Sequence, residues 1–293
     1  MFFIGAEGLV QDQFGRVLMI QRDDSRTWAL PGGGLEANEL PSNGMAREVF
    51  EETGYKVHPI RLTQLTYIRG REQDLLIFVL RGILRGGAAQ TSAESLQVAF
   101  VKTDHLPLMT PSHQERLQAN LHHPGGPPYL RQQERLSWSL RLLRRLVYRV
   151  KDGQRWWRGH LPYVPPRPWH IQAVVILQNE QGQVCWQEHD GVWTLPGGAC
   201  PVGQPPWDAA ANLTQAQIGA PVTLIDLAGV YVTPKNKMTL CFVGKMEPVG
   251  DAAAGRWASL EEIGDAAAES HQRFVQDSMT PHETTFFHTI PTA

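Results

Sequence analysis

Residues 33–55 read GGLEANELPSNGMAREVFEETGY, a glycine turn followed by a helix-like run that is rich in carboxylates. Pro41 suits the first turn of a helix, because its missing N–H is not needed there, and Gly54 suits the position just past a helix end. The stretch therefore predicts a helix over about residues 41–53. Gly44 falls inside this helix, where a glycine costs about 1 kcal/mol of helix stability.

Three glutamates of the predicted helix share one face. Glu48 and Glu52 are four residues apart, and Glu48 and Glu51 are three apart, spacings that bring side chains together. Like charges so placed repel by roughly 0.2–0.5 kcal/mol per pair on an exposed helix, and a bound cation would offset that repulsion. Ligands that are all oxygen favour a hard divalent ion, Mg2+ or Mn2+. Arg47, four residues before Glu51, can neutralise or orient a carboxylate.

A charge run of this kind is most often a solvated helix end. The glycine loop at residues 31–34 reverses that preference here. Glycines let the backbone approach a ligand closely, and free N–H groups before a helix cradle phosphate. We therefore interpret the stretch as a site for a metal ion and a phosphate group.

Written as a pattern, the stretch is G-x5-E-x7-R-E-U-x-E-E-x-G-U, where U is a bulky apolar residue, and every fixed position is filled. It resembles the box of the Nudix hydrolase superfamily. The resemblance implies an α/β/α sandwich with a mixed sheet over about residues 2–122. It also implies divalent-metal-dependent hydrolysis of a pyrophosphate bond in a nucleoside diphosphate linked to another group.

The same resemblance implies a role for each residue of the box. Glu51 and Glu52 are expected to be metal ligands, and Glu48 a metal ligand or the general base. Arg47 is expected to orient Glu48. Glu94, in a later loop, is either a further metal-binding residue or an ordinary exposed one. The expected site residues are Arg47, Glu48 and Glu52 for catalysis; Glu48, Glu51, Glu52, Glu94 and the carbonyl of Gly32 for the metal; and Arg22, Trp28, Gly33 and Glu39 for the substrate.

Two classes of substrate stay open. One is a (deoxy)nucleoside triphosphate or a modified nucleotide, favoured because the first domain is short. The alternative is ADP-ribose or a nucleotide sugar. An alternative of another class is a nucleotide-binding regulatory protein that acts through its second half.

The second half repeats the first. Residues 193–198 (WTLPGG) match residues 28–33 (WALPGG) at a shift of 165. Further expected matches are Tyr231 with Tyr67, Phe242 with Phe78, Trp257 with Phe100, and Ser270-His271 with Ser112-His113. In the repeated box, Gln204, Asn212, Leu213, Ala216 and Gln217 stand where Glu39, Arg47, Glu48, Glu51 and Glu52 stand. Without a carboxylate on the helix a divalent ion has no charged ligand there, so the second domain is predicted to be catalytically silent.

These patterns predict an α+β fold of two tandem Nudix-type α/β/α sandwiches with mixed sheets. We expect a catalytic domain at 1–123, a helical and proline-rich linker at 124–168 and a degenerate Nudix-like domain at 169–293. Leucines at helical spacing and many arginines over 131–158 predict a basic amphipathic helix in the linker. Its apolar stripe is expected to pack between the domains, and contact with nucleic acid or membrane is the alternative. Trp138, Trp156, Trp157 and Trp169 are expected to pack between the domains.

Composition limits the remaining possibilities. The net charge of −2 gives no global attraction to nucleic acid or membrane. The 3 cysteines have no CxxC spacing, which argues against a disulfide framework or a zinc site. The N-terminus has no basic region before an apolar one, so a cytoplasmic location is expected. The expected partner is a small nucleotide substrate, and the assembly is expected to be a monomer that forms an internal pseudo-dimer, or a homodimer.

Overall fold

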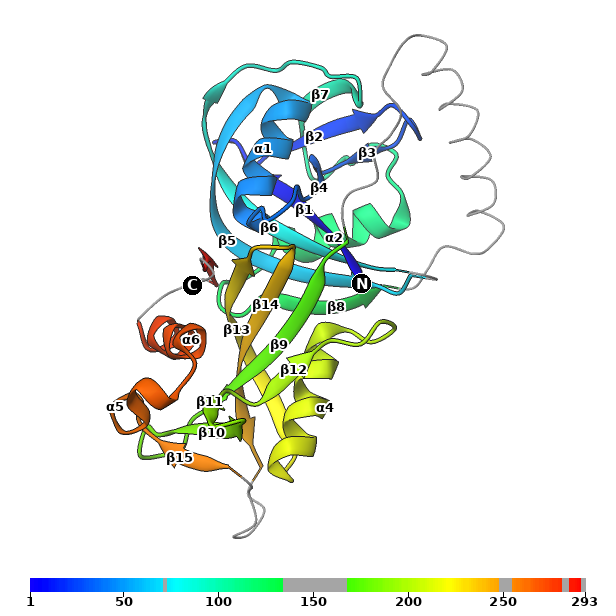
Figure 1. Cartoon of the computed structure of the whole chain (residues 1–293). Helices are drawn as coiled ribbons and strands as arrows, with labels where there is room; N and C mark the ends of the chain where they lie inside the picture. Colours follow the sequence, from blue (N-terminus) through cyan, green and yellow to red (C-terminus); the bar gives the residue numbers. More distant parts are fainter. Residues whose placement is uncertain (71–72, 134–167, 248–254, 281–284, 291–293) are drawn as a thin grey trace.

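The computed structural model describes residues 1–70, 73–133, 168–247, 255–280 and 285–290 (Figure 1). Residues 134–167, which include nearly all of the predicted basic helix and Trp138, Trp156 and Trp157, lie outside the described residues. Trp169 is described, and it is buried.

The described residues of the first half form two sheets and two helices. Its elements are β1 (Phe2–Val10), β2 (Val17–Arg22), β3 (Trp28–Ala29), β4 (Gly32–Gly34), α1 (Pro41–Thr53), β5 (Tyr55–Ile68), β6 (Asp74–Gly87), β7 (Ser95–Val101), α2 (Pro111–Leu121) and β8 (Tyr129–Gln133). The larger sheet has the order β4-β1-β6-β5-β8, in which β1 and β6 are parallel and β5 and β6 antiparallel. The smaller sheet has the order β3-β2-β7. Strand β8 lies within the segment expected to be linker, so the first sheet extends beyond residue 123.

Helix α1 begins and ends as the sequence predicts. Pro41 occupies its first turn, and Gly54 ends it in the left-handed conformation with φ of 75°. Met45 and Val49 of α1 pack on one face of the larger sheet, and Leu117 of α2 packs on the other. The first half is therefore an α/β/α sandwich.

The second half repeats this arrangement. Its elements are β9 (His170–Leu177), β10 (Val184–His189), β11 (Val192–Thr194), β12 (Gly197–Ala199), α4 (Pro206–Ile218), β13 (Val222–Thr233), β14 (Lys237–Met246), β15 (Arg256–Ala258), α5 (Leu260–Ile263), the 3-10 turn η1 (Gly264–Ala266), α6 (Glu269–Met279) and β16 (Phe286–Thr289). The sheets have the orders β12-β9-β14-β13-β16 and β11-β10-β15. The predicted fold class, two tandem Nudix-type sandwiches with mixed sheets, is confirmed.

Strand register defines which residues of the halves are equivalent. Glu7 stands opposite Gly32, and Val174 stands opposite Gly197, the matching glycine of the second half. The register continues from β1 through β6 to β5 in the first half, and from β9 through β14 to β13 in the second. It places Tyr231 at the position of Thr66. The expected match of Tyr231 with Tyr67 is therefore wrong, and so is that of Phe242 with Phe78.

The mismatch of Phe242 with Phe78 arises at the turn between the two long strands. It spans residues 69–73 in the first half and 234–236 in the second, so the shift between equivalent residues changes there. Tyr67 and Tyr231 both precede this turn, and the unchanged shift of 165 pairs Tyr67 with Val232. Tyr67 packs in the core beneath α1, whereas Tyr231 packs on the opposite face of its sheet beside Phe274 of α6.

The two halves pack against each other through a shared core. One cluster of buried residues contains Phe2 and Tyr67 of the first half and Trp169 and Ile171 of the second. Phe2 and Trp169 also exchange backbone hydrogen bonds of 3.0 and 2.8 Å. Figure 1 shows the halves stacked end to end, with the N-terminus at their junction. Trp169 therefore lies between the two halves, as expected.

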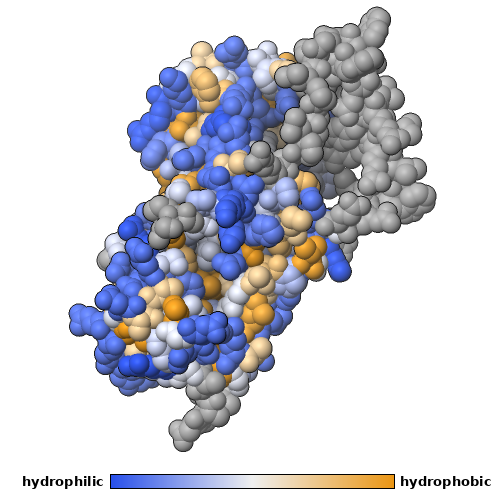
Figure 2. All heavy atoms as spheres, viewed as in Figure 1, coloured by the Kyte–Doolittle hydropathy of each residue, from blue (hydrophilic) through white to orange (hydrophobic). Residues whose placement is uncertain are grey.

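The outer surface mixes residue types. On the face shown in Figure 2, hydrophilic residues cover much of the first half, and apolar residues are interspersed along the second. Among the described residues, no helix is both long and apolar enough to cross a membrane.

Candidate active site

Arg47 connects the glycine loop to the carboxylates of α1. Its Nε and Nη2 each donate to one oxygen of Glu39, both at 2.9 Å, and Nη2 also donates to the Gly34 carbonyl at 3.0 Å. Its Nη1 donates to Glu48 Oε1 at 2.9 Å and to Glu51 Oε2 at 3.2 Å. The hydrogen bonds to Glu39 raise the pKa of Arg47, so the guanidinium stays charged. One side chain thus fixes the loop and the helix to each other.

Glu52 is the most enclosed carboxylate of the box. Its side chain is 5% exposed, and Oε2 accepts a 2.7 Å hydrogen bond from the backbone N–H of Gly32. Burial raises the pKa of Glu52 to about 8, and the negative charge of Glu48 adds to the increase. Burial also raises the pKa of Glu48, although Arg47 opposes the shift. Glu48 and Glu52 are therefore neighbouring carboxylates with little water around them to stabilise a negative charge.

The glycines of the box allow close contacts that a side chain would prevent. A Cβ placed on Gly33 would lie 2.6 Å from Cδ of Glu48. A Cβ placed on Gly44 would lie 2.2 Å from Cδ2 of Leu35 and 3.0 Å from Oε2 of Glu39. The helical penalty of Gly44 therefore has a physical reason: the loop that carries Glu39 passes directly over it.

Glu94 lies near the carboxylates of Glu48 and Glu52. Its negative charge contributes to the raised pKa values of both Glu48 and Glu52. The next residue, Ser95, donates a 2.6 Å hydrogen bond to the Glu52 carbonyl and so ties this loop to the end of α1. The role of Glu94 as a metal ligand stays a prediction.

The other predicted residues surround this centre. Arg22 lowers the pKa of Glu52 through its charge and is paired with Asp24, with Nε 3.1 Å from Oδ1. Glu51 is held by Arg47, and its side chain is 56% exposed. Trp28 is half-buried, and it packs against the core beneath α2 rather than against the box. The structure therefore gathers Arg22, Glu39, Arg47, Glu48 and Glu52 around the glycine loop, with Trp28 to one side.

The donor set suits a hard divalent cation. Within the described part of the chain, no three acidic, imidazole or thiol side chains already converge on one point. The half-buried Glu48 nevertheless raises the pKa of the buried Glu52, and a bound cation would relieve this repulsion. They and the Gly32 carbonyl, with Glu51 and Glu94 at the edge, would supply oxygen ligands of the kind that Mg2+ and Mn2+ prefer.

The equivalent place in the second half is neutral and internally hydrogen-bonded. Gln217 stands at the position of Glu52, and its Oε1 accepts from the Gly197 N–H at 2.7 Å. Its Nε2 donates to the Gly197 carbonyl at 2.9 Å. Leu213 replaces Glu48 and approaches Gly198. Gln217 and Leu213 carry no charge, and an amide hydrogen already occupies the carbonyl equivalent to that of Gly32, so these residues offer a cation neither a carboxylate nor a free carbonyl.

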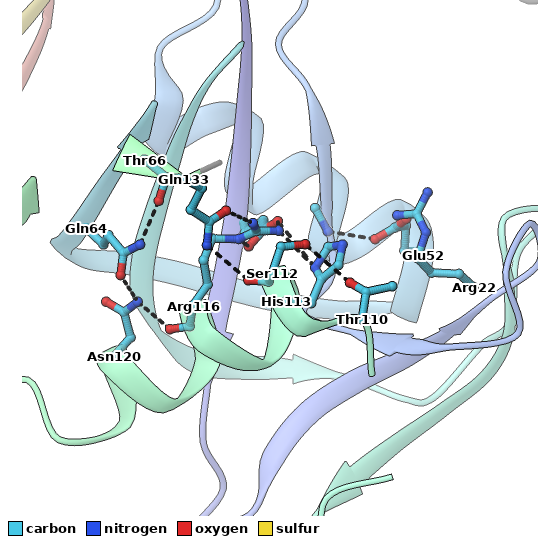
Figure 3. A network of polar contacts seen from close by, with 12 residues as sticks. Arg22, Glu52, Gln64, Thr66, Thr110, Ser112, His113, Arg116, Asn120 and Gln133 are labelled. Carbon is cyan, nitrogen blue, oxygen red and sulfur yellow. Dashed lines mark hydrogen bonds and ion pairs between the residues drawn. The ribbon is translucent and has the colours of Figure 1, made fainter. Parts of the chain in front are cut away.

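Sequence reasoning missed a charged cluster on the other side of β1. Glu7, His113, Arg116 and Gln133, here called the Glu7 cluster, are joined by hydrogen bonds beneath the larger sheet (Figure 3). A signal was present: Glu7 interrupts the apolar run of residues 2–10, whereas the matching strand has Val174. The match could be aligned only once the strand register was known.

Comparisons with known proteins agree with this geometry. The family model described as NUDIX domain matches residues 1–121 and 168–278. A MutT-like protein of Streptomyces ambofaciens is 39% identical over 103 residues, which cover 35% of this chain and 66% of the relative. A putative 8-oxo-dGTP diphosphatase of Bacillus subtilis is 29% identical over 118 residues, covering 40% of this chain and 78% of the relative. A putative ADP-ribose pyrophosphatase of the same organism is 28% identical over 102 residues, covering 33% of this chain and 49% of the relative.

Two tandem matches that together span most of the sequence define the class, and the chain belongs to the NUDIX domain family. The resemblance to Nudix hydrolases that the box indicated is confirmed at the level of the family, as is the tandem arrangement with a degenerate second box. The chain spans just under two thirds of its MutT-like relative.

Proposed function

We propose that this protein hydrolyses a pyrophosphate bond of a nucleotide in its first half, with Mg2+ or Mn2+ held by the box. The observation that carries the proposal is a pair of carboxylates, the half-buried Glu48 bound by Arg47 and the buried Glu52 bound by the Gly32 N–H. Such a pair is costly to keep without a cation, and it occurs only in the half whose box is complete.

The chemistry requires one bond to form and one to break. A water molecule adds to one phosphorus, the bridging P–O bond breaks, and the proton of the water passes to a base. When bound, the divalent ion neutralises phosphate oxygens and lowers the pKa of the attacking water. Glu48 is suited to accept the proton, because burial raises its pKa and Arg47 holds only its Oε1.

The remaining residues hold the phosphate chain and the loop. Arg22 brings a positive charge toward Glu52 and suits a phosphate oxygen of the substrate. Arg47 and Glu39 keep the glycine loop against α1. In the second half Gln217 bonds both the N–H and the carbonyl of Gly197, which supports a role of the Gly32 carbonyl beside Glu52. The substrate we favour is a (deoxy)nucleoside triphosphate or modified nucleotide, in line with the name of the 8-oxo-dGTP diphosphatase relative.

A second candidate substrate is ADP-ribose or a nucleotide sugar. The name of another Bacillus subtilis relative, a putative ADP-ribose pyrophosphatase, supports it. Both substrates contain the same phosphoanhydride bond, so the box chemistry is shared and only the surrounding contacts differ.

A substrate panel tests the proposal. Nucleoside triphosphates, 8-oxo-dGTP, ADP-ribose and nucleotide sugars are incubated with Mg2+ and with Mn2+, and the products are separated by chromatography. We expect turnover that disappears with a chelator and falls by roughly 1,000-fold in Glu52→Gln, the order of a lost electrostatic catalytic group. Glu36→Gln is a matched control, because Glu36 is an exposed glutamate of the loop between β4 and α1 and is not a fixed position of the box. No turnover of any compound, or equal turnover by the two variants, contradicts the proposal.

A further inference from the structure

Glu7 and Arg116 form a buried ion pair on the α2 side of the larger sheet. Arg116 donates from Nη2 and Nε to the two oxygens of Glu7 at 2.7 and 2.9 Å. The residues are 7% and 2% exposed. Burial alone would raise the pKa of Glu7, but Arg116 outweighs it and holds that pKa below its ordinary value, so the pair stays charged.

Two further side chains complete the arrangement around Arg116. Nη1 of Arg116 donates to Gln133 Oε1 at 2.9 Å, and Nη2 lies 3.0 Å from His113 Nδ1. A guanidinium is always a donor, so Nδ1 of His113 acts as the acceptor and the ring hydrogen lies on Nε2. The Glu7 cluster thus fixes one tautomer and one orientation of His113.

The second half provides an internal comparison for this cluster. Strand register matches Glu7 with Val174, since each stands opposite the matching box glycine. Trp28 forms a β-bridge with Met109 just before α2, and Trp193, the counterpart of Trp28, forms one with Ala267 just before α6. Helices α2 and α6 are therefore equivalent, and counting from the bridges pairs Arg116 with Phe274.

Gln133 of the Glu7 cluster also corresponds to an apolar residue of the second half. Gln133 ends strand β8 beside Ile68, and Ile290 continues β16 with its N–H bonded to the Val232 carbonyl. Val174 and Phe274 are buried in one apolar cluster, and Ile290 packs against it. The same fold is therefore built with three polar residues in one half and three apolar residues in the other.

Stability alone is a weak reason for the polar version, since an ion pair of good geometry and an apolar core can be equally stable. Removing two charges from water costs more than their attraction returns unless the geometry is excellent, and apolar replacements of a buried pair are often neutral or stabilising. In this chain the apolar version already exists in the half whose box has lost its carboxylates. The polar version occurs beside the complete box.

The polar cluster is connected to that box by the backbone. Glu7 is the strand partner of Gly32, and the Gly32 N–H holds Glu52. The charge of Arg22 lowers the pKa values of both Glu7 and Glu52, so the cluster and the site share one electrostatic environment. In Figure 3, His113 lies on the side of the cluster that faces Glu52 and Arg22.

We infer that Glu7, Arg116 and Gln133 are positioning residues for the Nudix site of the first half, which rests on the proposed function. They fix the strand edge that carries Gly32, and they present His113 with its hydrogen on Nε2 toward the substrate side. These three residues contribute to the position of the bound nucleotide relative to Glu48 and Glu52, and not to folding.

The test transplants the apolar set of the second half into the first. The variant Glu7→Val/Arg116→Phe/Gln133→Ile is compared with the wild type in the full chain, using the nucleotide turned over in the panel. We expect a melting temperature equal to or above that of the wild type, a kcat at least tenfold lower and a KM changed by less than threefold. Wild-type kcat and KM in the folded variant overturn the inference.

A matched variant separates positioning from stability. Phe274→Leu alters the residue of α6 that corresponds to Arg116, and we expect a lower melting temperature with unchanged kcat. If the triple variant does not fold, Glu7→Gln is measured instead, because it keeps the shape of the side chain and removes the charge. A kcat lower by at least threefold in Glu7→Gln supports the inference, and an unchanged kcat overturns it.

A readout that is independent of turnover keeps the two proposals distinguishable. Hydrogen exchange of the backbone amides over residues 28–40 reports the strand edge directly, with or without an active enzyme. We expect at least tenfold faster exchange there in the triple variant, and unchanged exchange overturns the inference. Absence of wild-type turnover would count against the proposed function alone.

Discussion

Asn38 and Asn236, which are 198 positions apart in the sequence, exchange a reciprocal pair of hydrogen bonds. The Asn38 N–H donates to Asn236 Oδ1 at 3.0 Å, and the Asn236 N–H donates to Asn38 Oδ1 at 2.9 Å. Both residues have left-handed backbones, with φ of 60° and 53°, which asparagine tolerates better than most residues. Asn38 immediately precedes Glu39, so the turn between β13 and β14 supports the loop that anchors Arg47.

An equivalent contact joins the turn between the long strands of the first half to the box loop of the second half. Asp74, at the turn between β5 and β6, accepts a 2.6 Å hydrogen bond from the N–H of Gly203, which lies in the loop before α4. Each half therefore supports the box loop of the other, although only one box retains its carboxylates.

Asn236→Gly is predicted to weaken the catalytic loop without straining the turn. Glycine accepts the left-handed backbone, so the change removes Oδ1 and leaves the N–H. We expect a loss of about 1 kcal/mol of unfolding free energy, the net value of one hydrogen bond, together with a lower kcat. Denaturant titration and steady-state kinetics measure the two effects.

Lys235→Gly is the matched control for that variant. Lys235 is the neighbouring residue of the same turn and also has a left-handed backbone, with φ of 68°. Glycine relieves its strain, so stability should hold or rise while kcat stays constant. Equal kcat in the two variants would show that the Asn38 contact does not reach the site.

Glu52→Gln is predicted to stabilise the protein while abolishing turnover. The variant reproduces the arrangement of Gln217, whose amide satisfies both the N–H and the carbonyl of its glycine. It removes a buried carboxylate whose pKa is raised to about 8, so we expect a gain of roughly 1–2 kcal/mol in the unfolding free energy without metal. Thermal melts with chelator present measure this gain, and a lower melting temperature would contradict it.

Gly44→Ala is predicted to destabilise α1, although alanine is the better helix former. The added Cβ would lie 2.2 Å from Leu35 Cδ2, and overpacking of this kind costs about 1–3 kcal/mol, more than the roughly 1 kcal/mol gained in helix propensity. Leu35→Val shortens the opposing side chain. In a double-mutant cycle it should recover part of the loss, and strictly additive effects would refute the contact.

His271 is predicted to make stability depend on pH below neutrality. Its Nδ1 accepts a 2.7 Å hydrogen bond from the Leu195 N–H, and burial lowers its pKa to about 4. Since the unfolded chain binds the proton more readily, the stabilisation is complete above about pH 6.5 and is lost as pH falls toward 4. The loss amounts to about 3 kcal/mol by linkage between these two pKa values.

His271→Asn retains an acceptor without the titrating ring. Denaturant titrations between pH 4 and 7 should show a smaller slope for this variant than for the wild type. Identical slopes would assign the pH dependence to other groups.

Local signals predicted the box well, and long-range pairing explains what they missed. The helix over 41–53 followed from a proline, a glycine and the spacing between them, all within one element. The match of Phe242 with Phe78 failed because a shorter turn moves the register, and register depends on pairing with strands distant in the sequence. Residues 129–133 were assigned to the linker for the same reason, since their partner strand begins more than 70 residues earlier.

The charged partners of Glu7 could not be predicted from the sequence. Arg116 follows it by 109 residues, on a helix whose position depends on the whole sheet. Gly44 was recognised only as a propensity cost, since the close passage of Leu35 is a tertiary contact.

The amide of Gln217 makes the loss of the second site difficult to reverse. A single return to glutamate at this position would bury a negative charge, leave the Gly197 carbonyl without its donor, and restore neither of the other carboxylates. Each intermediate on the way back would be less stable and still inactive. Selection acting one substitution at a time therefore has no favourable first step, and the second half is free to diverge as long as it supports the first.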